Sequence, residues 1–168
     1  MGFSYEYENK SYLEYMNKDL VTIVIIGRNE GKLLSKAFIS AKNAAKAFHD
    51  EGYNMPKIIY VDGQSTDNSL EIANQFDIES YVVDGIPTAA AGRHLGLLKC
   101  SSKYVFFLDG DNEMAENWLC DGIGYLEKHP EFAGVGGIQD LEYIINDRVV
   151  GHEKNRRSTK REGEIVND

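Results

Sequence analysis

Two aspartates, Asp109 and Asp111, stand one residue apart directly after the apolar segment 104–108. That segment has the composition of a strand buried on both faces. Two carboxylates at the end of such a strand repel each other and lose hydration, which is costly without a compensating cation. Mg²⁺ or Mn²⁺ would offset the cost, because hard divalent cations prefer oxygen ligands and commonly join carboxylates to substrate phosphates. The pattern indicates a metal site, and the alternative is a solvated Asp-Gly turn.

The elements that must position this motif alternate along the chain. Apolar and β-branched runs predict strands at 21–26, 57–61, 80–83 and 104–108. Apolar residues at helical spacing predict helices over 34–48, 70–76, 88–99 and 118–126. Beyond these, 132–137 resembles a glycine-rich strand, and 141–150 resembles a hairpin that turns at Asn146 and Asp147. Alternating strands and helices predict an α/β fold, a mainly parallel sheet sandwiched by helices.

Polar and glycine-rich segments follow each of the first four strands. In chain order these are Gly27, Arg28 and Glu30, then Asp62 and Gly63, then Asp84 and Gly85 with Arg93 beyond, and finally Asp109 and Asp111. The carboxyl ends of parallel strands meet at one edge of the sheet, where ligands of such folds bind. These segments are therefore expected to converge on one site. Glu30 also suits a second interpretation, because a carboxylate favours the positive N-terminus of the helix behind it.

Composition limits the possible functions. The 168 residues suit one domain or a part of a longer protein, and 42% hydrophobic residues are enough for a core. Eighteen basic against 27 acidic residues give a net charge of -9, which argues against nucleic-acid binding. Cys100 and Cys120 fit no metal or disulfide pattern, so a reducing compartment is expected. A cytoplasmic protein is predicted, with the cytoplasmic face of a membrane open as a location.

Four segments, in this order, resemble the catalytic domain of family 2 glycosyltransferases, the GT-A type. The resemblance covers residues 20 to 137. Val21–Glu30 is similar to the family's first strand and nucleotide loop, Ile58–Ser69 to its second strand and Asp-rich turn, Ala91–Gly96 to its Arg-containing helix, and Asp109–Asp111 to its Asp-x-Asp signature.

The resemblance implies roles for individual residues. Substrate-binding residues would be Gly27, Arg28, Glu30, Asp62, Arg93, Asp109 and Asp111. Asp62 would face a uracil base, Arg93 would meet the diphosphate, and Asp109 and Asp111 would hold Mn²⁺ or Mg²⁺. Gly63 stands where the family often has a second Asp, which departs from the family pattern.

The implied reaction is transfer of a sugar from a nucleoside diphosphate sugar, a UDP-sugar, to an acceptor with inversion at the anomeric carbon. Inversion needs a carboxylate base. The family's base lies well beyond Asp-x-Asp, and Asp140 and Glu142 come too soon. The chain is therefore expected to be the truncated, donor-binding part of a longer enzyme and inactive alone. Its expected parts are an N-terminal extension (1–18), the sugar-nucleotide domain (19–152) and a basic tail (153–168), solvated or in contact with phosphate.

Such a part would expose apolar surface around Trp118, Leu119, Tyr143 and Ile145, so a homodimer through this surface or through the aromatic N-terminal segment is a further expectation. Two other classes remain open. An NAD-binding domain would require Gly-x-Gly-x-x-Gly after the first strand, and Gly27 and Gly31 have the wrong spacing. A nucleotidyltransferase or a catalytically silent nucleotide-binding module is the other alternative, although Arg28 with Glu30 suits a triphosphate loop poorly.

Overall fold

A computed structural model describes residues 20–137, 139–145 and 148–155. The chain divides into two compact units, one ending at Ile123 and the other beginning at Gly124, and each is described by itself. The domain boundaries expected at residues 18 and 152 stay a prediction. Residues 153–155 of the expected basic tail belong to a strand, and the rest of that tail lies outside the described residues.

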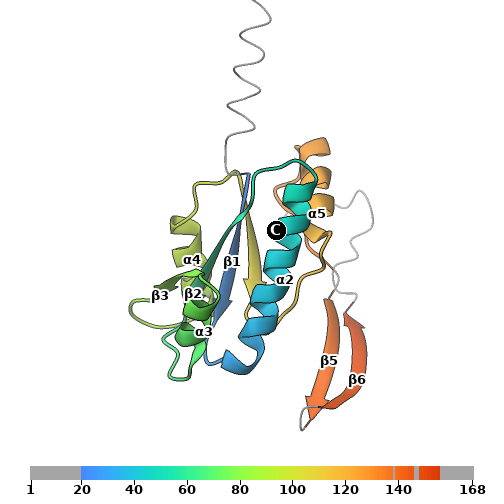
Figure 1. Ribbon diagram of the computed structural model, residues 1–168. Coiled ribbons are helices and arrows are strands. Elements are labelled where there is room, and N and C mark those ends of the chain that lie inside the picture. The colour runs from blue at the N-terminus through green and yellow to red at the C-terminus, as the bar shows by residue number, and fades with distance from the viewer. Residues whose placement is uncertain (1–19, 138, 146–147, 156–168) are drawn as a thin grey trace, which may run out of the picture. The chain divides into compact units, whose positions relative to one another are not determined.

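The first unit is built on a four-stranded sheet. Its strands are β1 (Val21–Gly27), β2 (Lys57–Asp62), β3 (Glu79–Val82) and β4 (Tyr104–Asp109). All three strand pairings are parallel, in the order β3-β2-β1-β4 (Figure 1). The predicted α/β fold with its parallel sheet is confirmed. Because β1 and β2 lie in the middle, their carboxyl ends are flanked by those of β3 and β4.

Helices cover both faces of this sheet. They are α2 (Gly31–Asp50), α3 (Ser69–Gln75), α4 (Ala89–Leu98) and α5 (Trp118–Lys128), of which the part up to Ile123 belongs to this unit. Buried residues of α2, α3 and α5 share one cluster with one face of β1, while α4 lies on the other face (Figure 1). The predicted helices therefore exist, each within a few residues of its expected bounds.

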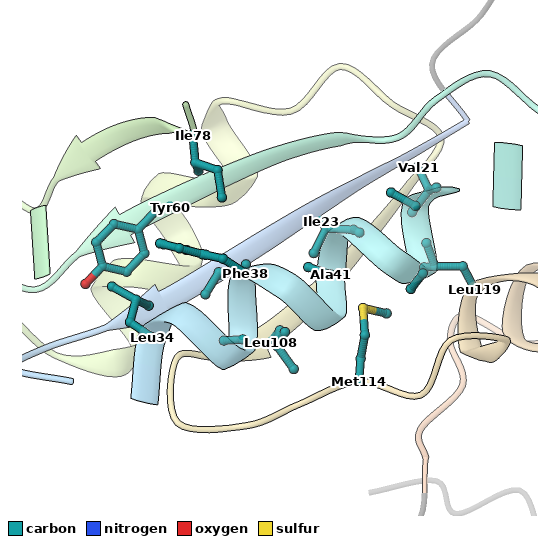
Figure 2. Packing of buried hydrophobic residues seen from close by; sticks show 14 of the residues in the cluster. Val21, Ile23, Leu34, Phe38, Ala41, Tyr60, Ile78, Leu108, Met114 and Leu119 are labelled. Atoms are coloured by element: carbon teal, nitrogen blue, oxygen red, sulfur yellow. The ribbon is translucent and has the colours of Figure 1, made fainter. Parts of the chain in front are cut away.

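The larger core forms between α2 and the sheet. Leu34, Phe38, Ala41 and Phe48 repeat at helical spacing on the face of α2 turned to the sheet, and all are fully buried. Phe38 meets the ring of Tyr60 edge-on, with 5.6 Å between centroids (Figure 2). This cluster fixes α2 against β1 and β2, and with it the turn that precedes α2.

The smaller core lies under α4 and depends on two glycines. Gly92 and Gly96 are buried against Ile26 and Val24 of β1. A Cβ on Gly96 would lie 2.3 Å from Val24 Cγ1, whereas one on Gly92 would keep an ordinary 3.6 Å from Ile26 Cγ2. The backbone of α4 therefore approaches the sheet closely at its C-terminal turn.

Three sequence-based expectations differ from the structure. β4 is buried at Leu108 but half-exposed elsewhere, with Phe107 36% exposed, because β4 is an edge strand of the four-stranded sheet and α4 lies over β1 and β2. Leu119 is buried and Trp118 packs edge-on against Phe106, so they do not form the expected exposed patch. Residues 132–137 form no strand.

The second unit contains the end of α5 and a hairpin. β5 (Gln139–Ile145) and β6 (Arg148–Asn155) pair antiparallel, with an irregularity in register at Tyr143 and Ile144. The hairpin is confirmed, while its predicted turn lies outside the described residues. Tyr125 and His129 stack with 4.3 Å between ring centroids. None of the helices in the described part of the chain is long and apolar enough to cross a bilayer.

The two glycines of α4 give a paired stability prediction. Gly96→Ala should lower the free energy of unfolding by about 1–3 kcal/mol, because the new methyl group overlaps Val24. Gly92→Ala, on the same helix, should be neutral or raise it by up to about 1 kcal/mol, because alanine favours helix and space is available. Urea unfolding measures both. Equal effects of the two substitutions would contradict the proposed close contact.

Candidate functional site

Asn29 joins the turn after β1 to the turn after β2. Its backbone N–H donates to Ser65 Oγ at 2.9 Å, and its side-chain oxygen accepts from the N–H of Thr66 at 2.7 Å. Asn29 has φ of 58°, a left-handed conformation that asparagine tolerates better than most residues. One side chain and its backbone therefore connect loops 36 residues apart in the sequence.

Asp67 completes this connection by capping two helices. Its Oδ2 accepts from the N–H of Gly31, the first residue of α2, at 3.0 Å. Its Oδ1 accepts from the N–H of Ser69, the first residue of α3, also at 3.0 Å. These bonds hold the pKa of Asp67 below its usual value, chiefly through the Ser69 hydroxyl. A carboxylate in this position satisfies the unpaired N–H groups of both helix starts.

A pocket of about 270 Å³ opens at the carboxyl ends of the strands. It is lined by segments that follow all four strands, as the sequence predicts. The lining residues are Ile26, Gly27, Arg28, Glu30, Val61, Gly63, Pro87, Thr88, Ala89, Gly92, Arg93, Asp109 and Asp111. Six of the seven predicted substrate-binding residues therefore meet in one pocket, and Asp62 is the exception.

Glu30 reaches over two glycines into the acidic end of the pocket. A Cβ on Gly27 would lie 2.5 Å from Glu30 Oε2, and one on Gly110 would lie 2.3 Å from the same atom. Oε2 is buried and has no hydrogen-bond partner in the described structure. Burial, and next the charge of Asp111, raise the pKa of Glu30 to about 7, against a smaller lowering by the backbone N–H of Arg28. Glu30 Oε2 is thus available to bind a cation or to accept a hydrogen bond from a ligand.

Glu30 is also the residue at the N-cap of α2, which the second interpretation of the sequence anticipated. Its side chain makes no capping hydrogen bond. The carboxylate that caps α2 comes instead from Asp67. The side chain of Glu30 is therefore directed to the pocket and does not cap the helix.

Arg93 and Asp109 form an ion pair within the pocket. Arg93 Nη2 donates to Asp109 Oδ1 at 2.6 Å, and both side chains are about two-fifths exposed. α4 brings Arg93 here, and Thr88 begins that helix by accepting the N–H of Ala91 on its hydroxyl. Partial exposure screens this pair, so its contribution to stability is small. The guanidinium lies beside the position of the predicted metal ligands.

Asp62 does not face the pocket. Its side chain is fully buried, with Oδ1 accepting from the Tyr60 hydroxyl at 3.0 Å and Oδ2 accepting from the N–H of Ser65 at 2.8 Å. Burial, and next the charge of Asp62, raise the pKa of Tyr60. The contact of Asp62 with a base stays a prediction, and in this structure both of its carboxylate oxygens are bonded within the protein. Strand alternation turns Asp62 inward, where it fixes the turn that carries Ser65 and Gly63.

Metal ligands are incomplete in the described part of the protein. No three side chains of His, Cys, Asp or Glu are arranged there to hold a metal ion. Asp109 and Asp111 line the same pocket with the unpartnered Glu30 oxygen nearby. These oxygen donors suit Mg²⁺ or Mn²⁺, which commonly take one or two carboxylates and complete their coordination with water and phosphate oxygens.

Three pocket residues, Pro87, Thr88 and Ala89, lie outside the motifs singled out in the sequence and form the wall at the start of α4. Gly63, which belongs to the motif after β2, lies beside Arg28 and forms the floor. The Pro-Thr pair before a run of alanines is a helix-start signal, which indicated the helix but not its part in the pocket. His94, the residue after Arg93, is exposed and does not line the pocket.

The fold resembles that of known proteins. The parallel sheet with its pocket at the strand ends has the GT-A fold of nucleotide-sugar transferases. The sequence profile of glycosyl transferase family 2 matches residues 22–163. The chain therefore belongs to glycosyl transferase family 2.

Among curated proteins, an uncharacterized glycosyltransferase of Haemophilus influenzae is 28% identical over 116 residues, which are 66% of this chain and 44% of that protein. Among solved structures, TarS of S. aureus in complex with UDP-GlcNAc has a TM-score of 0.53 and 18% identity, over 66% of this chain and 32% of that one.

Glucosyl-3-phosphoglycerate synthase of Mycobacterium tuberculosis, in complex with Mn²⁺, UDP and glucosyl-3-phosphoglycerate, has a TM-score of 0.54 and 15% identity, over 75% of this chain and 44% of that one. At these identities the two solved structures support the fold. The chain spans less than half of the length of each of these three proteins.

The burial of Glu30 gives a prediction about pH. Its pKa is raised from 4.5 to about 7, so between these values the folded chain retains a proton that the unfolded chain has lost. The contribution of Glu30 to stability is therefore fully present below pH 4.5 and is lost as the pH rises to 7. Glu30→Gln, which cannot ionise, should gain stability relative to the unaltered protein over this range.

Urea unfolding at several pH values, without added metal, measures this difference. The matched control is Glu71→Gln on the exposed side of α3, which should give a difference that does not change with pH. A flat difference for Glu30→Gln as well would show that Glu30 is not desolvated.

The buried position of Asp62 gives a second prediction. Asp62→Ala should lower the free energy of unfolding by about 1–3 kcal/mol for each donor left unpaired, namely the Tyr60 hydroxyl and the Ser65 N–H. Asp84→Ala, at the exposed residue after β3, should change stability little. Thermal unfolding compares the two. An Asp62→Ala protein as stable as the Asp84 variant would contradict the buried hydrogen bonds.

Proposed function

We propose that this chain binds the donor of a metal-dependent, inverting glycosyltransferase, and that the donor is a UDP-sugar. The observation that carries the proposal is the pocket, in which loops from four parallel strands bring Arg93 beside three carboxylates. Family membership supports a sugar-nucleotide ligand. The two solved relatives with the same fold are complexes with UDP-GlcNAc and with UDP and Mn²⁺, which supports uridine.

The order of the strands suggests how the donor lies. Pro87 and Thr88 follow β3, Gly63 follows β2, Arg28 and Glu30 follow β1, and Asp109 and Asp111 end β4.

The nucleoside would occupy the end between Gly63 and Pro87, where these two residues and Ala89 leave room for a flat base. The diphosphate would lie toward Arg93 and the aspartates. Charge supports this orientation, because phosphate groups bind where a guanidinium and a metal ion stand together.

Asp111 and Asp109 would hold Mg²⁺ or Mn²⁺ with the diphosphate. The metal would neutralise the charge that develops on the leaving diphosphate. Asp111 is exposed and so accessible to an ion from solvent. Asp109 already pairs with Arg93 at 2.6 Å, so the diphosphate would take over the guanidinium as the metal takes the carboxylate. Glu30 Oε2, buried beside Gly110, would receive a donor from the metal's water shell or the ligand.

Inversion requires a base that takes the proton of the acceptor. We assign no residue of the pocket to this role, because Glu30, Asp109 and Asp111 would lie at the diphosphate end. The acceptor and its base would belong to a part of the protein beyond the matched region. This chain alone would then bind the donor and transfer no sugar. Titration of UDP, GDP and NAD with and without Mn²⁺ separates this function from a dinucleotide-binding or nucleotidyltransfer function.

The metal site gives the decisive prediction. Asp111→Asn should remove most of the gain in UDP affinity that Mn²⁺ provides, about tenfold or more, because hard cations depend on anionic oxygens. Isothermal titration calorimetry with and without Mn²⁺ measures it. Asp77→Asn is the control, since Asp77 precedes β3 at the opposite edge of the sheet and its left-handed backbone suits asparagine.

An unchanged metal dependence in Asp111→Asn would remove Asp111 from the metal site. A chain that binds no nucleoside diphosphate under any condition would overturn the proposed function itself.

A further inference from the structure

Gln64 extends the connection between β2 and β3 beyond the point where their backbones stop pairing. The last backbone hydrogen bond that the structure describes there runs from the N–H of Val83 to the carbonyl oxygen of Asp62, at 2.9 Å. Past this point the Gln64 side chain takes over. Its Nε2 donates to the carbonyl oxygens of Val83 at 3.0 Å and of Gly85 at 2.8 Å. One amide group thus supplies the two donors that a continuing strand would have offered.

The backbone of Gln64 is unusual for its residue type. Its φ of 61° is left-handed, a conformation that glycine adopts without the steric clash that a residue with a Cβ meets. The local turn alone would therefore be served better by glycine. Gln64 is mostly exposed, so it contributes little to the core. The two hydrogen bonds of its side chain are what a glycine would lack.

The segment that Gln64 holds leads into one wall of the pocket. Gly85, whose φ is 83°, turns the chain, and Pro87, Thr88 and Ala89 follow as lining residues. Ile86 is 82% exposed, so the packing of its side chain contributes little to holding this segment. Gln64 does not line the pocket, although its neighbour Gly63 does. The side chain therefore ties the floor at Gly63 to the wall at Pro87.

We propose that Gln64 is a positioning residue that sets the width of the nucleoside end of the pocket. This inference rests on the proposed function for the identity of the ligand. We call the two hydrogen bonds from Gln64 Nε2 to Val83 and Gly85 the latch. Without the latch, the segment 84–88 would sample positions in which the wall lies away from Gly63. Only the fraction of molecules with the wall in place would bind at full strength, and the apparent dissociation constant rises by the inverse of that fraction.

The diphosphate end should not depend on Gln64. Arg93 is held by Asp109, and Asp111 follows β4, so these groups keep their places when the wall loosens. Loss of the latch should therefore weaken a ligand that carries a nucleoside and leave pyrophosphate binding unchanged. A purely structural role for Gln64 would weaken both ligands or neither.

Two variants of the full chain test the proposal. Gln64→Gly removes the latch and relieves the left-handed backbone, so its thermal stability should stay close to that of the unaltered protein. Gln64→Glu keeps the size of the side chain and replaces the donating amide with a carboxylate that only accepts. Gln75→Glu, at an exposed position at the end of α3, is the control for the added charge.

The first measurement needs no ligand. Nitrogen-15 relaxation should show the order parameters of the Gly85 and Ile86 amides falling from about 0.85 toward 0.6 in both Gln64 variants, while those of the sheet do not change. In the second measurement, calorimetry with Mg²⁺, UDP should bind about five- to tenfold more weakly to both variants if one molecule in five to ten keeps the wall in place. Pyrophosphate with Mg²⁺ should bind as before.

Unchanged order parameters in the Gln64 variants would overturn the latch. Loosening without a change in UDP affinity, or equal weakening of UDP and pyrophosphate, would overturn its effect on the nucleoside end. If the unaltered chain binds no UDP, the proposed function fails and the claim about affinity fails with it. The relaxation data would then still decide whether Gln64 holds the segment 84–88.

Discussion

The mutual hold of two turns, after β1 and after β2, is the constraint on which the site depends. Gly63 donates its N–H to the carbonyl oxygen of Gly27 at 2.8 Å, Asn29 bridges to Ser65 and Thr66, and Asp67 caps α2 across the gap. None of these contacts belongs to regular secondary structure. They fix the positions of the turns that follow β1 and β2, and hence the positions of Arg28 and Glu30 relative to Gly63. Because α2 packs through Phe38 onto the sheet, the two hydrogen-bonded turns cannot move without disturbing the core.

Much of this arrangement could be predicted from the sequence, because it follows from patterns with a short range. Strand and helix periodicity gave the alternation of elements, and the parallel topology then required the segments after each strand to meet. The predictions that were wrong concern the burial and pairing of strands, which depend on the elements packed beside them and not on the periodicity of the sequence. The apolar run of β4 resembles a central strand, yet Phe107 is 36% exposed because α4 lies over β1 and β2. The glycine-rich segment 132–137 fits a strand pattern, but it pairs with no strand among the residues that the structure describes.

Asp62 and Gln64 show the same limit at the level of single side chains. A carboxylate at the end of a strand can turn to the ligand or to the core, and only the positions of Tyr60 and the Ser65 N–H decide for the core. Gln64 carries no signal in the sequence, because a polar residue in a turn is ordinary. Its importance appears only when its amide is seen to reach Val83 and Gly85 on another loop. Resemblance to a family selected segments that line one pocket, since it compares whole segments, but it could not assign each side chain an orientation.

The fit of Glu30 over Gly27 and Gly110 has a consequence for how sequences of this fold can diverge. The Glu30 carboxyl occupies the volume that a methyl group at either glycine would need, with its Oε2 at 2.5 Å and 2.3 Å from the two hypothetical Cβ atoms. Substitutions at positions 27, 30 and 110 are therefore coupled. A relative that keeps glutamate at position 30 can acquire alanine at position 27 or 110 only if the glutamate carboxyl moves, while a relative with a shorter side chain at position 30 meets no such clash with that carboxyl. Covariation between positions 27 and 30 and the distant position 110 would record this steric constraint around one oxygen atom.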